Sequence, residues 1–157
     1  MTIETGKQFC CQKLISLRTM GTQAEISTAV KRLCNYLKSK AINRAGPTIT
    51  GIFSVDHKGG DTILDMEILI PIDRLFAPEY GYIFKSKFQL TNAAHICYKG
   101  KPEMLQDACN EIIRHIQELE HQDITTLYKV MTAEPIMING KPGDIIVDLY
   151  IDVNPAI

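Results

Sequence analysis

Apolar and polar side chains alternate along residues 61–73 (DTILDMEILIPID) and again along residues 144–154 (DIIVDLYIDVN). A period of two is typical of a half-buried strand, because successive side chains point to opposite faces of a sheet. We therefore predict a strand at each stretch, with an aliphatic side and an acidic side. The aliphatic sides hold Met66, Ile68, Ile70 and Ile72, and Ile145, Val147, Leu149, Ile151 and Val153; the acidic sides hold Asp61, Asp65 and Glu67, and Asp144, Asp148 and Asp152 with Tyr150.

Apolar residues recur at helical spacing in residues 22–41 and 102–120. The first stretch opens with Thr22 and Glu25, the pattern of a capping box. The second has Pro102, which suits a first helical turn because its missing N–H is not needed there. We predict two amphipathic helices, each of which buries one apolar stripe. The stripes are Ile26, Val30, Leu33 and Leu37 in the first helix, and Leu105, Ala108, Cys109, Ile112, Ile116 and Leu119 in the second.

The predicted elements occur twice in the same order, strand–helix–strand–strand. Matching Asp61 to Asp144 shifts the numbering by 83, and matching the two helix starts shifts it by 80, about half of the 157 residues. Such self-similarity indicates an internal duplication. We predict a single domain, residues 1–157, made of two pseudo-repeats at about 7–73 and 86–154. The remaining strands are predicted at residues 7–19, 48–55, 87–98 and 125–133.

Each half is predicted to end in a hairpin. Residues 57–61 (HKGGD) supply two glycines for the positive φ angles of a tight turn, and residues 138–144 (INGKPGD) supply Asn-Gly, a strong hairpin signal. Residues 72–87 (IDRLFAPEYGYIFKSK) join the halves, and we interpret them as a crossover packed on the sheet.

These elements predict an α+β fold. Two strand–helix–strand–strand units can form one antiparallel sheet with both helices on one face, where each helix buries its stripe. The opposite face then has no cover, and the acidic sides of residues 61–73 and 144–154 point to it if their aliphatic sides meet the helices. We expect these acids to converge on a groove.

Charge and composition exclude several classes of function. Seventeen basic and eighteen acidic residues give a formal charge of -1, so the chain lacks the basic field that binds nucleic acid directly. No stretch approaches the ~20 apolar residues of a membrane span, and residues 1–10 do not resemble a signal peptide. We expect a cytoplasmic protein with no membrane association and no direct nucleic-acid partner.

Catalytic and metal-binding motifs are also missing from the sequence. The five cysteines form no C-x-x-C pair, which favours reduced, packed thiols over a disulfide framework or a zinc site. The four histidines form no ligand motif; Asp107, Glu111 and His115 can share a helix face, but a solvated helix flank is the simpler interpretation. No G-x-S-x-G elbow and no phosphate-binding loop occurs. We therefore predict no catalytic residue, metal or cofactor.

The chain resembles the gyrase-inhibitor-like small-molecule-binding domain, which is also the effector-binding part of multidrug-responsive bacterial transcription regulators. The resemblance covers nearly the whole chain and rests on the repeated order of elements and two motifs. Residues 42–56 (INRAGPTITGIFSVD) look like the family's Gly-Pro entry into a strand, and residues 65–73 (DMEILIPID) are similar to its acidic strand ending in Ile-Pro-Ile. The family's His-x-Gly-Pro-Tyr opening of the second helix appears here only as YKGKPEM.

The resemblance implies a groove between the two halves, where aromatic rings sandwich a flat, often cationic ligand and a carboxylate neutralises it. Asp148 takes the place of the family's acidic residue in the last strand, although no proline follows until Pro155. A carboxylate beside aromatic walls favours a cation, and cation–π contacts add roughly 0.5–2 kcal/mol. The predicted ligand-binding residues are Asp148, Tyr150, Glu67, Asp65, Phe53, Tyr80, Tyr82 and Tyr128.

The leading hypothesis is a stand-alone bacterial domain that binds a small, flat, cationic molecule. It has two rivals: a protein-interaction or inhibitor module that uses the open sheet face, and a small hydrolase in which Glu67 and Tyr150 act on a bound ligand. The structural alternative for the acids is an ordinary solvated sheet face. The crossover aromatics have an alternative role as core residues. The sequence leaves the oligomeric state open.

Overall fold

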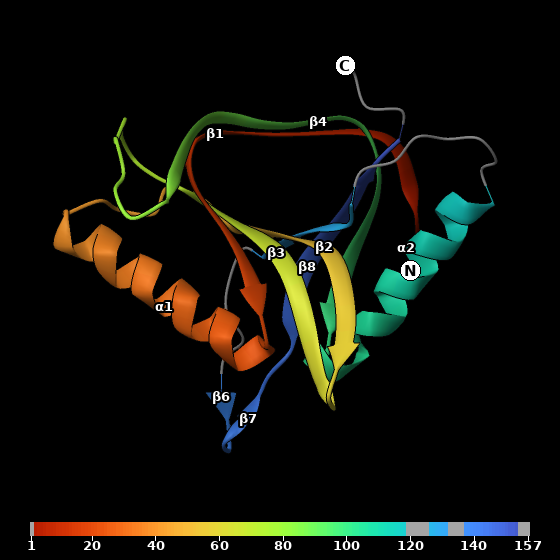
Figure 1. The fold of residues 1–157 in the computed structure, drawn as a ribbon. Coiled ribbons are helices and arrows are strands. Elements are labelled where there is room, and N and C mark those ends of the chain that lie inside the picture. Colours follow the sequence, from red (N-terminus) through yellow and green to blue (C-terminus); the bar gives the residue numbers. More distant parts are fainter. Residues whose placement is uncertain (1, 119–125, 132–136, 154–157) are drawn as a thin grey trace. The chain divides into compact units, whose positions relative to one another are not determined.

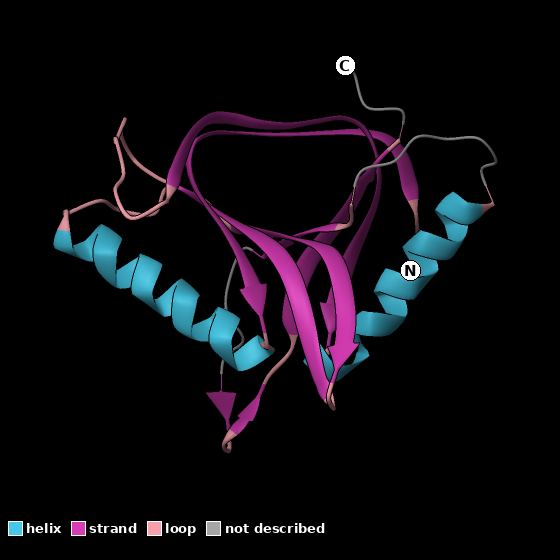
Figure 2. Cartoon of the chain, viewed as in Figure 1, coloured by secondary structure: helices cyan, strands magenta, loops and turns pink. Residues whose placement is uncertain are grey.

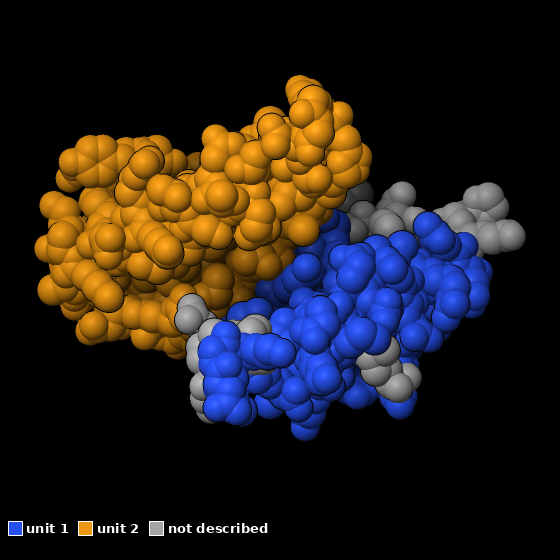
Figure 3. Space-filling model, turned by 90° about the horizontal axis from the view of Figure 1, so that it is seen from below, with its two compact units in different colours: residues 1–10, 89–157 blue, residues 11–88 orange. Residues whose placement is uncertain are grey.

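A computed structural model describes residues 2–118, 126–131 and 137–153 of the chain (Figure 1). The chain divides into two compact units, coloured separately in Figure 3. Unit 1 comprises Met1–Cys10 and Gln89–Ile157, and unit 2 comprises Cys11–Phe88. Both boundaries fall inside long strands, β1 (Glu4–Gly21) and β4 (Ile83–Gly100), so each of these strands contributes residues to both units.

Unit 2 contains the second part of β1, helix α1 (Gln23–Ser39), and strands β2 (Thr48–Lys58) and β3 (Asp61–Pro71). Strand β3 lies in the middle and pairs antiparallel with both β1 and β2. The β2–β3 turn has the predicted Gly-Gly pair at positive φ, 57° for Gly59 and 86° for Gly60.

Helix α1 begins at the predicted capping box. The Thr22 hydroxyl accepts a hydrogen bond from the Glu25 backbone N–H at 3.2 Å, and the Glu25 carboxylate accepts one from the Thr22 N–H at 3.0 Å. The buried stripe of α1 packs against the aliphatic side of β3, as predicted. The buried residues of this cluster include Ile26, Leu33 and Leu37 of the helix and Met66, Ile68 and Ile70 of the strand.

Unit 1 repeats the same order of elements. It contains the second part of β4, the 3₁₀ turn η1 (Pro102–Met104), helix α2 (Leu105–Gln117), and strands β5 (Tyr128–Met131) and β8 (Ile145–Asp152). Strand β8 lies in the middle, antiparallel to β4 and β5. Its aliphatic side packs on α2, again as predicted: the buried cluster includes Ala108, Cys109, Ile112 and Ile116 of the helix and Ile145, Val147, Leu149 and Ile151 of the strand. Leu119, predicted for this stripe, lies outside the described residues.

Helices and antiparallel strands make this an α+β chain, the predicted class (Figure 2). The long strands extend beyond the predicted bounds of 7–19 and 87–98, since β1 and β4 each have 18 residues. The Asn-Gly turn, with φ of 51° at Asn139 and 75° at Gly140, does not join two long strands. It closes a separate small hairpin of β6 (Met137–Ile138) and β7 (Lys141–Pro142). Within the described residues, no helix is long and apolar enough to cross a membrane.

Candidate functional site

The acidic side of β8, in unit 1, carries Asp148 and Tyr150, and it faces away from the α2 core. The strand register places His95 of β4 and Tyr128 of β5 opposite Tyr150. Cys97 lies opposite Asp148 on β4. The structure therefore brings together three of the predicted site residues, Asp148, Tyr150 and Tyr128, on one side of one three-stranded sheet.

The Asp148 carboxylate lies next to aromatic side chains, and one of them, His95, is hydrogen-bonded to it. The Nε2 atom of His95 lies 2.8 Å from Oδ1 of Asp148, a hydrogen bond that the imidazole donates, and the Asp148 side chain stays 29% exposed. The His95 ring packs on the Tyr150 ring at 4.7 Å between centroids, and Phe9 of β1 packs on Tyr150 at 5.2 Å. The face thus combines a partly exposed carboxylate with three rings that contact one another at tilted angles, Phe9, Tyr150 and His95.

The hydroxyl and thiol on this face are not activated. Burial raises the pKa of Tyr150, and the Asp148 charge raises it further, so the phenol stays protonated at neutral pH. Burial, the Asp148 charge and a hydrogen bond to Asp148 raise the pKa of the Cys97 thiol, whereas a nucleophilic cysteine needs a lowered pKa. The arrangement is suited to attracting a cation and donating hydrogen bonds.

Glu67, on the acidic side of β3 in unit 2, is bound by donors of its own unit. Its side chain is 10% exposed, and Oε2 accepts hydrogen bonds from the Ser16 hydroxyl and the Lys85 ammonium, both at 2.6 Å. Because the Lys85 charge already neutralises this carboxylate, Glu67 has little attraction left for a cationic ligand. The same contacts occupy Oε2, one of the two carboxylate oxygens that the hydrolase hypothesis could use as a base.

Asp65 and Phe53 are also occupied inside unit 2. Both Asp65 oxygens accept hydrogen bonds from the Arg18 guanidinium, at 2.8 and 2.9 Å. These hydrogen bonds hold the pKa of Asp65 below its usual value. The Arg18 carbon Cζ lies 3.9 Å above the centre of the Phe53 ring. Arg18 is therefore the cation that contacts both the Asp65 carboxylate and the Phe53 ring within unit 2.

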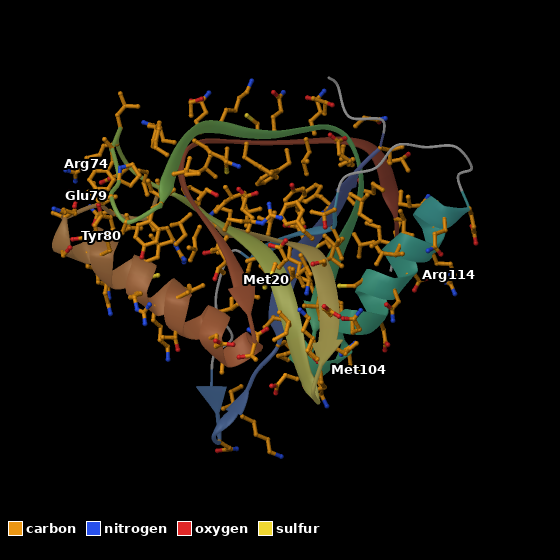
Figure 4. All side chains as sticks on the ribbon, in the orientation of Figure 1. Met20, Arg74, Glu79, Tyr80, Met104 and Arg114 are labelled. Atoms are coloured by element: carbon orange, nitrogen blue, oxygen red, sulfur yellow. The ribbon has the colours of Figure 1, made fainter. Side chains whose placement is uncertain are left out.

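Tyr80 and Tyr82 lie on the helix side of unit 2. Their rings pack on Tyr36 of α1, at 5.6 and 5.3 Å between centroids. The Tyr36 hydroxyl accepts a hydrogen bond from the Glu79 backbone N–H at 3.0 Å. Figure 4 shows Glu79 and Tyr80 beside the end of α1, and Tyr36 and Tyr82 pack against the core cluster between α1 and the aliphatic side of β3. The structure thus does not bring these two tyrosines to Asp65 and Glu67, and a role as ligand walls stays a prediction.

Asp152, at the end of the acidic side of β8, has a structural role. Its side chain accepts hydrogen bonds from the backbone N–H groups of Thr91 and Asn92, at 3.2 and 2.8 Å, and the residue is 2% exposed. A solvated face was the sequence-based alternative for the acids. It does not describe Asp152 or Glu67, both of which are buried.

The groups that bind these carboxylates, His95, Arg18 and Lys85, were not predicted from the sequence. A signal for His95 was present, because Ala94, Ile96 and Tyr98 form the apolar side of their strand and leave His95 and Cys97 on the other. Within the described residues, His, Cys, Asp and Glu side chains form no group of three that could hold a metal ion.

Comparisons with known proteins show a similar fold in solved structures. No protein-family model and no curated protein sequence matches the chain. EcmrR, in a cryo-EM structure of its complex with DNA, matches with a TM-score of 0.73 and 13% identity over 99% of this chain. The match spans 58% of the EcmrR chain. SAV2435, solved bound to tetraphenylphosphonium, matches with a TM-score of 0.49 and 9% identity over 98% of this chain and 94% of its own. At 13% identity the likeness to EcmrR concerns the fold alone.

Proposed function

We propose that the chain binds a small, flat, cationic aromatic molecule on the side of the unit 1 sheet that carries Asp148. One observation carries the proposal: Asp148 is a partly exposed carboxylate next to the tilted, contacting rings of Tyr150 and His95. A carboxylate near apolar rings is poorly solvated, so a cation that arrives there recovers electrostatic energy. The ring faces add cation–π and stacking contacts.

The proposed binding residues are Asp148, Tyr150 and Tyr128, with Phe9 and His95 as further ring contacts. In this role Asp148 neutralises the ligand's charge. Tyr150 supplies a ring face and, because its pKa is raised, a hydroxyl that stays a hydrogen-bond donor. Unit 2 is assigned no ligand contact, since Glu67 and Asp65 already hold the cationic groups of Lys85 and Arg18.

The wider role that we propose is that of a ligand-sensing domain of the gyrase-inhibitor-like class. Two things support it: the sequence motifs of residues 42–56 and 65–73, and the fold shared with EcmrR, a larger chain that has been solved in complex with DNA. The composition gives these 157 residues no basic field with which to bind DNA directly.

A fluorescence titration tests the binding proposal. Ethidium is a suitable probe because it is flat, aromatic and permanently cationic, and neutral phenanthridine is its uncharged counterpart. We expect saturable binding of ethidium, at least about tenfold weaker binding of phenanthridine, and a loss of about tenfold or more in ethidium affinity in Asp148→Asn, as for removal of one close charge.

Asp144→Asn is the matched control, because Asp144 is an exposed residue just before the same strand and the substitution removes the same charge. It should leave the affinity within about twofold, as expected for an exposed charge outside the contact. The proposal is wrong if ethidium does not saturate the protein, or if the two asparagine variants bind it equally well.

A further inference from the structure

His95 occupies the place next to Asp148 that a ligand's cation would take. Its Nε2 atom is 2.8 Å from Oδ1 of Asp148, and its ring lies on Tyr150 with 4.7 Å between centroids. The imidazole therefore has the two contacts, one to the carboxylate and one to a ring face, that the proposed function assigns to a flat cation. The His95 side chain is 14% exposed, so its position is fixed by packing.

The charge of this pair depends on a proton. A neutral imidazole donates its N–H to Asp148 and leaves the carboxylate with its full negative charge. A protonated imidazole makes the pair electrically neutral, so a cationic ligand loses its attraction and meets a like charge. Histidine is the side chain whose charge ordinarily changes between pH 5 and 8.

We propose that His95 makes ligand binding on this face proton-linked: protonation of His95 excludes the cation, and binding of the cation expels the proton. This inference rests on the proposed function and adds that pH regulates the binding of the ligand. It also narrows the ligand class to molecules that stay cationic at the pH where imidazole is neutral, such as quaternary aromatic cations. Binding should therefore weaken as the surroundings become acidic.

Other titratable groups face His95 from the neighbouring strands. On β1, Glu4 lies near enough to interact with the His95 charge, but the hydrogen bond from Lys7 lowers the pKa of Glu4, so it stays ionised. On β8, burial raises the pKa of Tyr150, so its phenol stays neutral beside the Asp148 carboxylate.

On the strand of His95 itself, burial and the Asp148 charge raise the pKa of the Cys97 thiol, so it stays protonated, and Lys99 lies near enough to act on that thiol. Tyr128 faces Tyr150 from β5. Among the described groups that β1, β4, β5 and β8 place around the Asp148 carboxylate, His95 is the histidine, the type of side chain whose charge ordinarily changes between pH 5 and 8.

Unit 2 provides an internal contrast. Glu67 is paired with the ammonium group of Lys85 and not with an imidazole. The equivalent carboxylate of unit 2 therefore has a lysine as its partner, whereas Asp148 is neutralised only when its imidazole is protonated. This difference makes the unit 1 face a site whose charge can be switched.

The test is the pH profile of ethidium affinity, measured by fluorescence titration between about pH 5.5 and 8, a range that brackets histidine titration. The charge of ethidium does not change there. For the wild-type protein we expect affinity to rise with pH, by up to about tenfold per unit at the acidic end, the limit for release of one proton, and then to level off. Calorimetry near pH 6 in two buffers of different ionisation enthalpy should show proton release on binding.

His95→Gln keeps an N–H donor near Asp148 but cannot take up a proton, so its affinity should stay flat across the range. His57→Gln is the matched control, since His57 is exposed on β2 of unit 2, and it should keep the wild-type slope. Ethidium binding with no pH dependence, or a slope that survives in His95→Gln, overturns this inference but leaves the proposed function standing. An absence of ethidium binding at every pH overturns both.

Discussion

At the scale of single residues, what distinguishes the carboxylates of β3 and β8 is the group that neutralises each of them. Glu67 holds an ammonium and a hydroxyl, Asp65 holds a guanidinium, and Asp152 holds two backbone N–H groups. Asp148 holds an imidazole, whose charge depends on pH. These partners decide whether a carboxylate stabilises the fold or remains available to a ligand.

The Glu67–Lys85 pair should matter for stability. Lys85→Met removes the cation and leaves a buried carboxylate with only the Ser16 hydroxyl, and we expect the free energy of unfolding to fall by about 1–3 kcal/mol. Urea denaturation measures the change. Lys58→Met is the control, because Lys58 pairs with Asp56 at 3.7 Å on the surface, and its loss should cost less than about 0.5 kcal/mol. Equal effects of the two substitutions would show that burial of Glu67 adds nothing.

The Asp65–Arg18 pair should make the stability of the fold sensitive to acid. Its pKa is lowered in the folded state by the hydrogen bonds from Arg18, so the pair contributes stability at pH values above the unfolded carboxyl pKa of about 3.9. That contribution is lost as the pH falls through the lower, folded pKa. Thermal melting between about pH 5 and pH 2 should show the difference between wild type and Asp65→Asn shrinking toward zero, across the range of carboxyl titration. A constant difference across this range would mean that protonation of Asp65 is not involved.

At the scale of the elements, the two helices start differently. Helix α1 has a reciprocal capping box, whereas no side chain caps α2 or the 3₁₀ turn before it. Thr22→Ala should therefore lower the free energy of unfolding by about 1 kcal/mol. Thr28→Ala, in the exposed interior of the same helix, removes only a hydrogen bond to the Ala24 carbonyl and should have an effect of less than about 0.5 kcal/mol. Denaturation curves of the two variants compare these costs, and equal losses would contradict a capping role.

Helices and strands with one buried side could be predicted from the spacing of their apolar residues alone. The alternation of β3 and β8 and the stripes of α1 and α2 gave the faces that pack together in each unit. The beginning of β1 could not be found in this way, because its residues are mostly exposed and carry no alternation of burial. The Asn-Gly turn was recognised by its chemistry, but a turn signal does not say which strands it joins, and here it closes β6 and β7.

At the scale of the whole molecule, the two units share an order of elements but differ in their chemistry. The sequence placed Glu67 and Asp148 in equivalent strands, and from this similarity both were predicted to bind a ligand. Their partners could not be predicted in the same way, because Lys85 and His95 lie on another strand and reach the carboxylates only through the strand register and the side-chain packing. The repeated pattern therefore predicted which face of its strand each carboxylate lies on. Tertiary contacts decide whether that carboxylate is bound by the protein itself or remains available to a ligand.

This difference predicts one ligand per chain. If Asp148 is the carboxylate that binds a cation and Glu67 is not, a titration of ethidium should reach saturation at one molecule per chain. At a ligand concentration of about 100 times Kd, binding stabilises the folded state by about 2.7 kcal/mol, which corresponds to a rise in Tm of about 5–10 °C for a chain of this size.

The carboxylate variants separate the two units. Glu67→Gln should lower the Tm of the free protein, because it disrupts the contacts with Ser16 and Lys85, and yet show the full rise on adding ethidium. Asp148→Asn should keep its Tm closer to that of the wild type and show almost no rise, while Asp144→Asn should behave as the wild type does. Two bound molecules per chain would mean that unit 2 binds the ligand as well. A rise in Tm that disappears in Glu67→Gln but persists in Asp148→Asn would mean that unit 2 is the ligand-binding unit and that its Lys85 moves aside to admit the ligand.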